Sequence, residues 1–291
     1  MKKLRSFDVF GNIAIVKFPS GLSVSEKKKF ANKILKENGS VRTILEKVGK
    51  FSGRLRKMRT KHVAGEKTKE VLYKENDCVF RFNIDTTYFS SRLSNERKEV
   101  ASKIKKKDKV LVMFAGVAPF SIIIAKKSGA EVWSNELNRE ANKYAKLNID
   151  LNKLKERVHL VSGDVKKVFG ENTSAQPNSA IGKSSSISRL PTRNLSLSNN
   201  LAHPFPKKFD VIVMPRPNLQ DTFLAEAFKV SKKGTRIFYY GFCEEKEKDK
   251  IIEQIKEEAK KARKKIKILK SSKAGEIGPY KIRLRVEFRV L

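Results

Sequence analysis

The chain has 291 residues, with 65 lysines and arginines against 31 aspartates and glutamates, giving a formal net charge of +34. This length allows one large domain or two modest ones, and the excess of cations favours a polyanionic partner such as RNA or DNA. No apolar run approaches the roughly 20 residues of a membrane helix, and the first ten residues lack the apolar stretch of a secretion signal. We therefore expect a cytoplasmic protein with no membrane partner.

The residues that most often bind metals are few and scattered. The two cysteines, Cys78 and Cys243, and the three histidines, His62, His159 and His203, show no metal-ligand spacing. We therefore expect no metal site, and we expect the cysteines to be ordinary thiols in a reducing compartment.

The N-terminal part of the chain predicts a small α/β unit. Residues 7–18 predict a strand with a glycine turn, and a helix follows that ends at Asn38 and Gly39. Residues 41–49 predict a strand or a short helix. The run FSGRLRKMRTKHVAGE, residues 51–66, carries five closely spaced cations and fits contact with a phosphate backbone. A solvated basic loop is the alternative.

A hairpin and a helix follow this unit. Apolar and polar residues alternate over 71–73 and 79–84, which predicts two strands joined by a turn at residues 75–77. Ser94 is placed to cap the next helix. We set a domain boundary near residue 92.

The stretch from Val110 to Asn138 predicts a strand, a tight turn, a helix and a second strand. Pro119 suits the first turn of the helix, and Gly129 suits its C-terminal cap. Glu136 ends the second strand about 20 residues beyond the glycine turn, the usual offset for a carboxylate that binds ribose hydroxyls. From this stretch alone the turn could bind NAD, bind S-adenosylmethionine, or bind nothing.

The rest of the chain continues the alternation of strands and helices. A third strand ends at Gly163 and Asp164, and a fourth ends in the run MPRP, residues 214–217. Residues 171–206 are rich in serine and asparagine and predict a flexible insertion. A short loop after residues 268–279 leads to the final strand, which we expect to be antiparallel. The pattern predicts an α/β fold with a mostly parallel sheet and helices on both faces.

Four strand ends should meet in one crevice, at the carboxyl edge of the sheet. The turn offers backbone amides, Glu136 can accept hydrogen bonds from ribose hydroxyls, and Asp164 can accept one from an adenine amino group. The alternatives are a surface acid for Glu136 and a helix cap for Asp164.

The runs VMFAGVAPFSI, SGDV and TTYFSSRLSNER, with the acidic strand end, resemble the archaeal and eukaryotic tRNA guanine-N1 methyltransferases. These enzymes act on the guanosine just 3′ of the anticodon, guanine 37. The resemblance runs from about Phe7 to the C-terminus, apart from the insertion. It implies a class I, Rossmann-like methyltransferase domain at 93–291 behind a smaller α/β RNA-binding domain at 1–92. It also implies S-adenosylmethionine as cofactor and tRNA as partner. We expect a monomer.

The resemblance also assigns roles to residues. Glu96 matches the general base that removes the N1 proton, and Arg56 matches an arginine that stabilises charge on O6. Without the resemblance, Glu96 would be a helix first-turn acid. The expected cofactor-binding residues are Phe114, Ala115, Gly116, Val117, Glu136, Asp164, Val165 and Tyr88. The expected substrate-binding residues are Arg92, Pro215 and Arg216.

Three residues depart from the family pattern. Val112 stands where an acid is usual, Ala118 replaces a second glycine, and Pro215 replaces the asparagine of an Asn-Leu-Pro motif. Arg216 could supply the hydrogen bond to the base that Pro215 cannot make. Two alternative functions remain open: transfer of the aminocarboxypropyl group of the same cofactor in wybutosine synthesis, and tRNA binding without catalysis.

Overall fold

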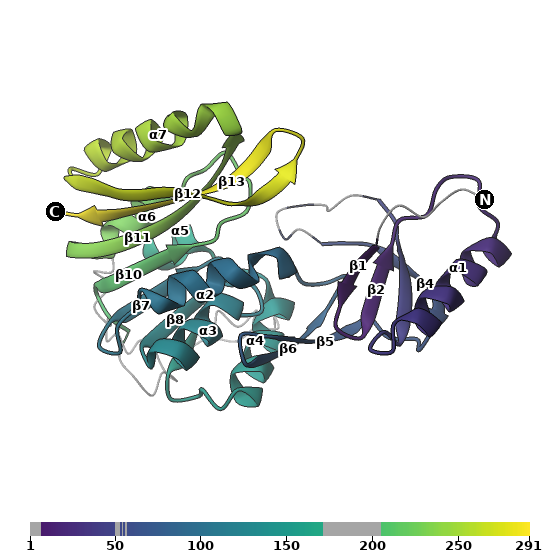
Figure 1. The fold of residues 1–291 in the computed structure, drawn as a ribbon. Coiled ribbons are helices and arrows are strands. Elements are labelled where there is room, and N and C mark those ends of the chain that lie inside the picture. Colours follow the sequence, from purple (N-terminus) through teal and green to yellow (C-terminus); the bar gives the residue numbers. More distant parts are fainter. Residues whose placement is uncertain (1–6, 50–52, 54, 56, 171–204) are drawn as a thin grey trace, which may run out of the picture.

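The computed structural model describes residues 7–49, 53, 55, 57–170 and 205–291, which form two regions joined by a hairpin (Figure 1). The N-terminal region is a small sheet with one helix on it. The C-terminal region is a larger sheet with helices on both faces. None of the described helices is long and apolar enough to cross a membrane.

The N-terminal sheet has the order β1-β2-β3-β4, formed by β1 (Phe7–Phe10), β2 (Ile13–Val16), β3 (Thr43–Lys47) and β4 (Thr60–Gly65). β2 and β3 are parallel, and the other two pairs are antiparallel. The helix α1 (Val24–Glu37) connects the two parallel strands and covers one face of the sheet. The expected helix is therefore confirmed.

Side chains of β2 and β3 alternate between two cores, as the period of a strand requires. Ala14 and Ile44 pack under α1, whereas Ile13 and Leu45 face the hairpin and join the core of the large sheet. The small sheet is thus packed between its own helix and the hairpin.

The hairpin consists of β5 (Glu70–Glu75) and β6 (Cys78–Asn83), as predicted. Asparagine amides bind both of its outer edges. Asn12 bonds the backbone of Glu70 and Leu72 on β5. Two asparagines of α4 (Arg139–Leu151), Asn148 and its C-cap Asn152, bond the backbone of Arg81 and Val79 on β6.

These amides act like partner strands, because each one donates to a carbonyl and accepts from an amide of the same strand residue or its near neighbour. The hairpin therefore contacts the small sheet along one edge and the large sheet's helix α4 along the other. The domain boundary near residue 92 stays a prediction. The packing of the hairpin favours a boundary before residue 70.

The large sheet has the strand order β12-β13-β11-β10-β7-β8-β9. β13 is antiparallel to its neighbours β11 and β12, and the remaining pairs are parallel. The order reverses between β7 and β10, which creates the switch point where α/β sheets bind ligands. The strands are β7 (Lys109–Met113), β8 (Glu131–Glu136), β9 (Val158–Ser162), β10 (Phe209–Met214), β11 (Ser231–Glu244), β12 (Ile266–Gly278) and β13 (Lys281–Val290).

Both faces of this sheet are covered. Val110 and Val112 of β7 pack under α2 (Ser94–Ser102), α3 (Pro119–Ser128) and α4. Leu111 and Met113, on the opposite side of the strand, pack with α5 (Val165–Phe169), α6 (Leu224–Lys229) and α7 (Lys248–Lys261). Short 3₁₀ turns span Ser91–Leu93 and Glu245–Glu247. The predicted α/β fold with helices on both faces is confirmed.

Some local features differ from the sequence analysis. Residues 268–279, to which no element was assigned, lie mostly in β12, an edge strand that pairs with β13 and needs apolar residues on one face only. Ser94 lies inside α2 instead of capping it, and its side chain accepts from Asn76. Most of the insertion at 171–206 lies outside the described residues. Its Phe205 packs against Phe169 and Phe209.

Candidate active site

The turn after β7 has an unusual backbone. Phe114, Gly116 and Ala118 all have positive φ, at 57°, 59° and 67°. For Phe114 and Ala118 this left-handed conformation costs energy, and such strain concentrates at functional sites. The turn brings the amide of Gly116 to the carboxylate of Glu136 at 2.8 Å. Ala115 and Val117, also predicted for the site, lie buried in the turn.

Glu136, at the end of β8, is held by backbone amides. Its Oε2 accepts from Gly116, and its Oε1 accepts from the amide of Asn138 at 2.7 Å. Burial raises the pKa of this carboxyl group, although the backbone hydrogen bonds oppose that shift. Each carboxylate oxygen keeps acceptor capacity beyond these bonds. Glu136 can therefore accept two further hydrogen bonds from a ligand.

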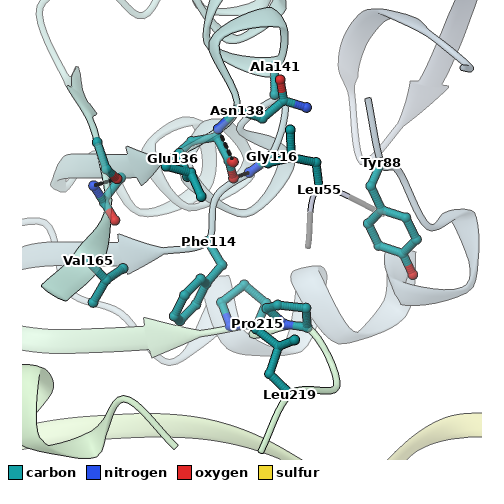
Figure 2. Close-up of a pocket in the computed structure, with 14 residues that line it drawn as sticks. Leu55, Tyr88, Phe114, Gly116, Glu136, Asn138, Ala141, Val165, Pro215 and Leu219 are labelled. Atoms are coloured by element: carbon teal, nitrogen blue, oxygen red, sulfur yellow. Dashed lines mark hydrogen bonds between the residues drawn. The ribbon is translucent and has the colours of Figure 1, made fainter. Parts of the chain in front are cut away.

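A pocket opens beside this carboxylate at the carboxyl ends of β7, β8, β9 and β10. Figure 2 shows Glu136 on one side, Pro215 and Leu219 on the opposite side, and Phe114 between them. The predicted residues that line it are Tyr88, Phe114, Gly116, Glu136, Val165 and Pro215. Gly163 and Pro217, from the third and fourth strand ends expected at the crevice, line it as well. Sequence reasoning missed Leu55, Asn135, Leu137, Asn138, Ala141 and Leu219.

Asn135 is the most informative of the missed residues. Its side chain is fully buried and donates to the carbonyls of Val161 and Gly163. Within the described residues its Oδ1 is buried without a hydrogen-bond partner. A buried acceptor of this kind costs free energy unless a ligand or water satisfies it. Its position beside Glu136 in the run SNELN was the available signal.

Asp164 lies beside the pocket as the N-cap of α5, where its carboxylate accepts from the amide of Lys166 at 2.9 Å. Gly163 and Val165, on either side of it, line the pocket, but the Asp164 side chain is not part of the lining. The helix-cap alternative is therefore realised in the structure. Contact of Asp164 with an adenine stays a prediction.

Arg216 does not line the pocket. It is 6% exposed, and its Nη1 donates to the carbonyls of Leu219 and Asp221, each at 2.9 Å, and of Pro217 at 3.3 Å. Its guanidinium lies 5.2 Å from the ring centroid of Tyr239. Nη1 is therefore committed to the loop after β10. Replacement of the missing asparagine by Arg216 stays a prediction.

Glu96 lies in the core between α2 and the large sheet. Its Oε1 accepts from the hydroxyl of Tyr240 at 2.9 Å and from the guanidinium of Arg285 at 2.5 Å. Arg285 also binds Glu99. Glu96 does not line the pocket, and within the described residues no hydrogen bond reaches its Oε2. Its role as the base stays a prediction, with one oxygen fixed and one available.

Arg92 and Arg56 complete the predicted set. Arg92 is exposed, lies 3.4 Å from Asp8, and borders a groove formed by residues 276–282 at the tip of the β12–β13 hairpin. It is therefore outside the pocket. Arg56 lies outside the described residues, while its neighbour Leu55 lines the pocket.

In the described part of the chain, no group of acidic, histidine and cysteine side chains is arranged to hold a metal ion.

Known proteins are similar to this chain in sequence and in fold. The family model described as the TRM5/TYW2 methyltransferase domain matches residues 71–181, and the TYW2 N-terminal domain matches residues 1–68. A Nanoarchaeum equitans protein named tRNA (guanine(37)-N(1))/4-demethylwyosine(37)-methyltransferase is 34% identical over 98% of this chain and 100% of its own length.

Solved structures agree with this similarity. The crystal structure of Trm5b from Pyrococcus abyssi matches with a TM-score of 0.77 at 29% identity, covering 99% of this chain and 75% of that one. A structure of Methanocaldococcus jannaschii Trm5 in complex with adenosine matches with a TM-score of 0.73 at 22% identity, covering 98% and 74% of the two chains.

The strand order, the antiparallel β13 and the pocket at the switch point define a class I, Rossmann-like methyltransferase. The predicted class of protein is thereby confirmed. The chain belongs to the TRM5/TYW2 family of methyltransferases.

Proposed function

We propose that this chain transfers the methyl group of S-adenosylmethionine to N1 of guanosine 37 in tRNA. The observation that carries the proposal is the pocket beside Glu136, in a chain of which 98% aligns with the Nanoarchaeum protein named as a tRNA (guanine(37)-N(1))-methyltransferase. The charge of +34 supports a tRNA partner. We further propose that the chain works as a monomer in the cytoplasm.

The residues of the pocket fit the cofactor. The carboxylate of Glu136 has acceptor capacity for two ribose hydroxyls, and the buried Oδ1 of Asn135 offers a further acceptor. Phe114, Leu137 and Val165 supply apolar surface for a purine ring. When bound, the cofactor supplies an electrophilic methyl group on a sulfonium centre.

The chain's own task is to hold the target base and to accept its proton. The base must leave its stack to be reached, and Tyr88, Pro215 and Leu219 offer flat or apolar surfaces against it. As N1 gains the methyl group it loses its proton, and Glu96 remains our candidate acceptor of that proton through Oε2.

Neither cysteine has a catalytic partner among the described residues, and burial raises the pKa of the Cys78 thiol to about 11. No covalent enzyme intermediate is needed.

A second substrate is favoured by the loop after β10. Pro215 has no amide N–H, and Arg216 is not part of the lining, so this wall offers the base apolar contact. A wall without fixed donors discriminates little between guanine and a larger tricyclic base. We therefore propose 4-demethylwyosine, which the name of the Nanoarchaeum relative includes, as a further methyl acceptor.

The test is mass spectrometry of nucleosides from tRNA incubated with the chain and cofactor. Unmodified transcript should gain 1-methylguanosine, and tRNA carrying 4-demethylwyosine should gain one methyl group. Appearance of an aminocarboxypropyl adduct would replace the proposal by the wybutosine alternative. Cofactor binding and tRNA binding without any product would support a non-catalytic role.

Two matched variants test Glu96 as the base. Glu96→Gln and Glu99→Gln each remove one carboxylate from Arg285. We expect Glu96→Gln to lower turnover by about 100-fold or more and Glu99→Gln to lower it by less than about threefold, with tRNA affinity unchanged in both. Equal turnover in the two variants would leave Glu96 with a structural role only.

A further inference from the structure

Tyr88 forms one wall of the pocket, and the segment that carries it is held at both ends. Two residues before it, the carbonyl of Thr86 accepts from Asn138 Nδ2 at 2.9 Å. Two residues after it, the carbonyl of Ser90 accepts from Arg97 Nη2 at 3.0 Å. These two bonds pin the backbone on either side of Tyr88.

The segment also lies directly against the glycine turn. A Cβ built on Gly116 would lie 3.4 Å from the carbonyl oxygen of Tyr88. The placement of this backbone therefore sets how far the Tyr88 wall stands from the turn. A shift of about 1 Å in such a wall is enough to alter ligand binding and reaction rates strongly.

The side chain of Arg97, which binds Ser90, is buried and held in one orientation. It is 1% exposed, and its Nε and Nη2 bind the two oxygens of Glu75 at 2.5 and 2.7 Å. A buried, bidentate pair of this kind fixes the guanidinium plane. Glu75 is the last residue of β5, so the hairpin anchors the guanidinium that holds Ser90.

Aromatic rings reinforce the same position. The guanidinium lies 5.1 Å from the ring centroid of Phe89, the residue next to Tyr88, and 5.8 Å from that of Phe120 on α3. Phe89 in turn stacks on Phe82 of the hairpin at 4.6 Å. Arg97 thus contacts both residues that follow Tyr88 and the helix that follows the glycine turn.

We propose that Arg97 is a positioning residue for the cofactor pocket, acting through Phe89 and Ser90 to hold the Tyr88 wall against the glycine turn. Arg97 itself does not line the pocket within the described residues. This proposal rests on the proposed function, because the ligand whose binding it affects is S-adenosylmethionine.

A double-mutant cycle tests it, with cofactor binding to the full chain measured by calorimetry. Arg97→Lys keeps the charge but loses the fork that serves Glu75 and Ser90 together. We expect the Kd for S-adenosylmethionine to rise about tenfold in Arg97→Lys and about tenfold in Tyr88→Ala. The combined variant should also show about tenfold, because residues that act through one another are not additive.

Two further variants separate positioning from general stability. Asn152→Ala removes the bonds that hold Val79 of the same hairpin to α4, without touching the segment around Tyr88. It should lower the Tm and leave the Kd unchanged. If Arg97→Lys does not fold, Arg97→Met combined with Glu75→Gln removes both buried charges and should show the same rise in Kd.

An unchanged Kd in folded Arg97→Lys, or a loss of about 100-fold in its combination with Tyr88→Ala, would overturn the proposal for Arg97 alone. A wild-type chain that does not bind S-adenosylmethionine would overturn the proposed function and this proposal together.

Discussion

The half of the pocket built on β7 and β8 offers hydrogen-bonding groups, whereas the half built on β10 offers apolar surface. On the first side, Gly116 and Asn138 direct backbone amides at Glu136. On the second, Pro215 and Leu219 line the pocket, while Nη1 of Arg216 binds carbonyls of the loop after β10. We therefore expect the first side to select its ligand by hydrogen bonds and the second to select by shape and stacking.

The polar half should be the more sensitive to a single change. We expect Glu136→Gln to raise the Kd for S-adenosylmethionine by about 100-fold, because a hydrogen bond to a charged group contributes about 1.5–3 kcal/mol and two ribose hydroxyls lose such a partner. Calorimetry gives the value. Leu219→Ala on the apolar half serves as the control and should change this Kd by less than about threefold. A reversal of the two effects would show that the cofactor lies on the β10 side.

The apolar half should depend on Arg216, which holds the loop after β10. We expect Arg216→Met to lower the free energy of unfolding by about 1–3 kcal/mol, because the carbonyls of Leu219 and Asp221 lose a buried donor. Turnover should fall by about tenfold with cofactor affinity unchanged. Denaturant unfolding and single-turnover kinetics measure these two quantities. If Arg216 instead bound the base directly, tRNA affinity would fall and the unfolding midpoint would stay in place.

The carboxyl group of Glu136 should also make the polar half pH-dependent. Burial raises its pKa above the value in the unfolded chain. Its protonated form therefore contributes stability that is present below the unfolded pKa and lost as the pH rises through the folded pKa.

Ribose hydroxyls need the ionised acceptor, so cofactor binding should change in the opposite direction. We expect binding to strengthen by about threefold to tenfold as the pH rises through that same window, while the apo chain loses stability relative to Glu136→Gln. Calorimetry and thermal unfolding at several pH values measure both trends. A wild-type chain whose binding is as flat with pH as that of Glu136→Gln would contradict this.

The difference between the two halves also explains what the sequence could predict. The turn, Glu136 and the alternation of strands and helices follow from local patterns: a buried β-branched strand, small residues, a proline at the helix start and an acid at a strand end. These patterns depend on neighbours in the chain, and the structure places Gly116 and Glu136 together as expected.

The β10 half depends on long-range contacts that no local pattern reports. Arg216 is an ordinary basic residue in the sequence, and only the folded loop shows that carbonyls of residues 217–221 occupy it. Likewise, the partners of Glu96 lie 144 and 189 residues away along the chain. The resemblance to a family suggested roles for these residues, but their partners required the fold.

The smallest effect is expected for Arg92, whose substitution tests whether tRNA contacts the surface outside the pocket. Its side chain is 73% exposed, and its contact with Asp8 is long, at 3.4 Å, so the pair contributes little stability. We expect Arg92→Ala to weaken tRNA binding by about threefold and to reduce the slope of log affinity against log salt by about one, as the loss of one phosphate contact would. Asp8→Asn removes the acid that competes for Arg92 and should leave tRNA binding equal or slightly tighter. Filter binding across a salt series measures both. A change in the cofactor Kd of Arg92→Ala would instead place this arginine at the pocket, because an exposed contact with a tRNA phosphate should not alter cofactor binding beside Glu136.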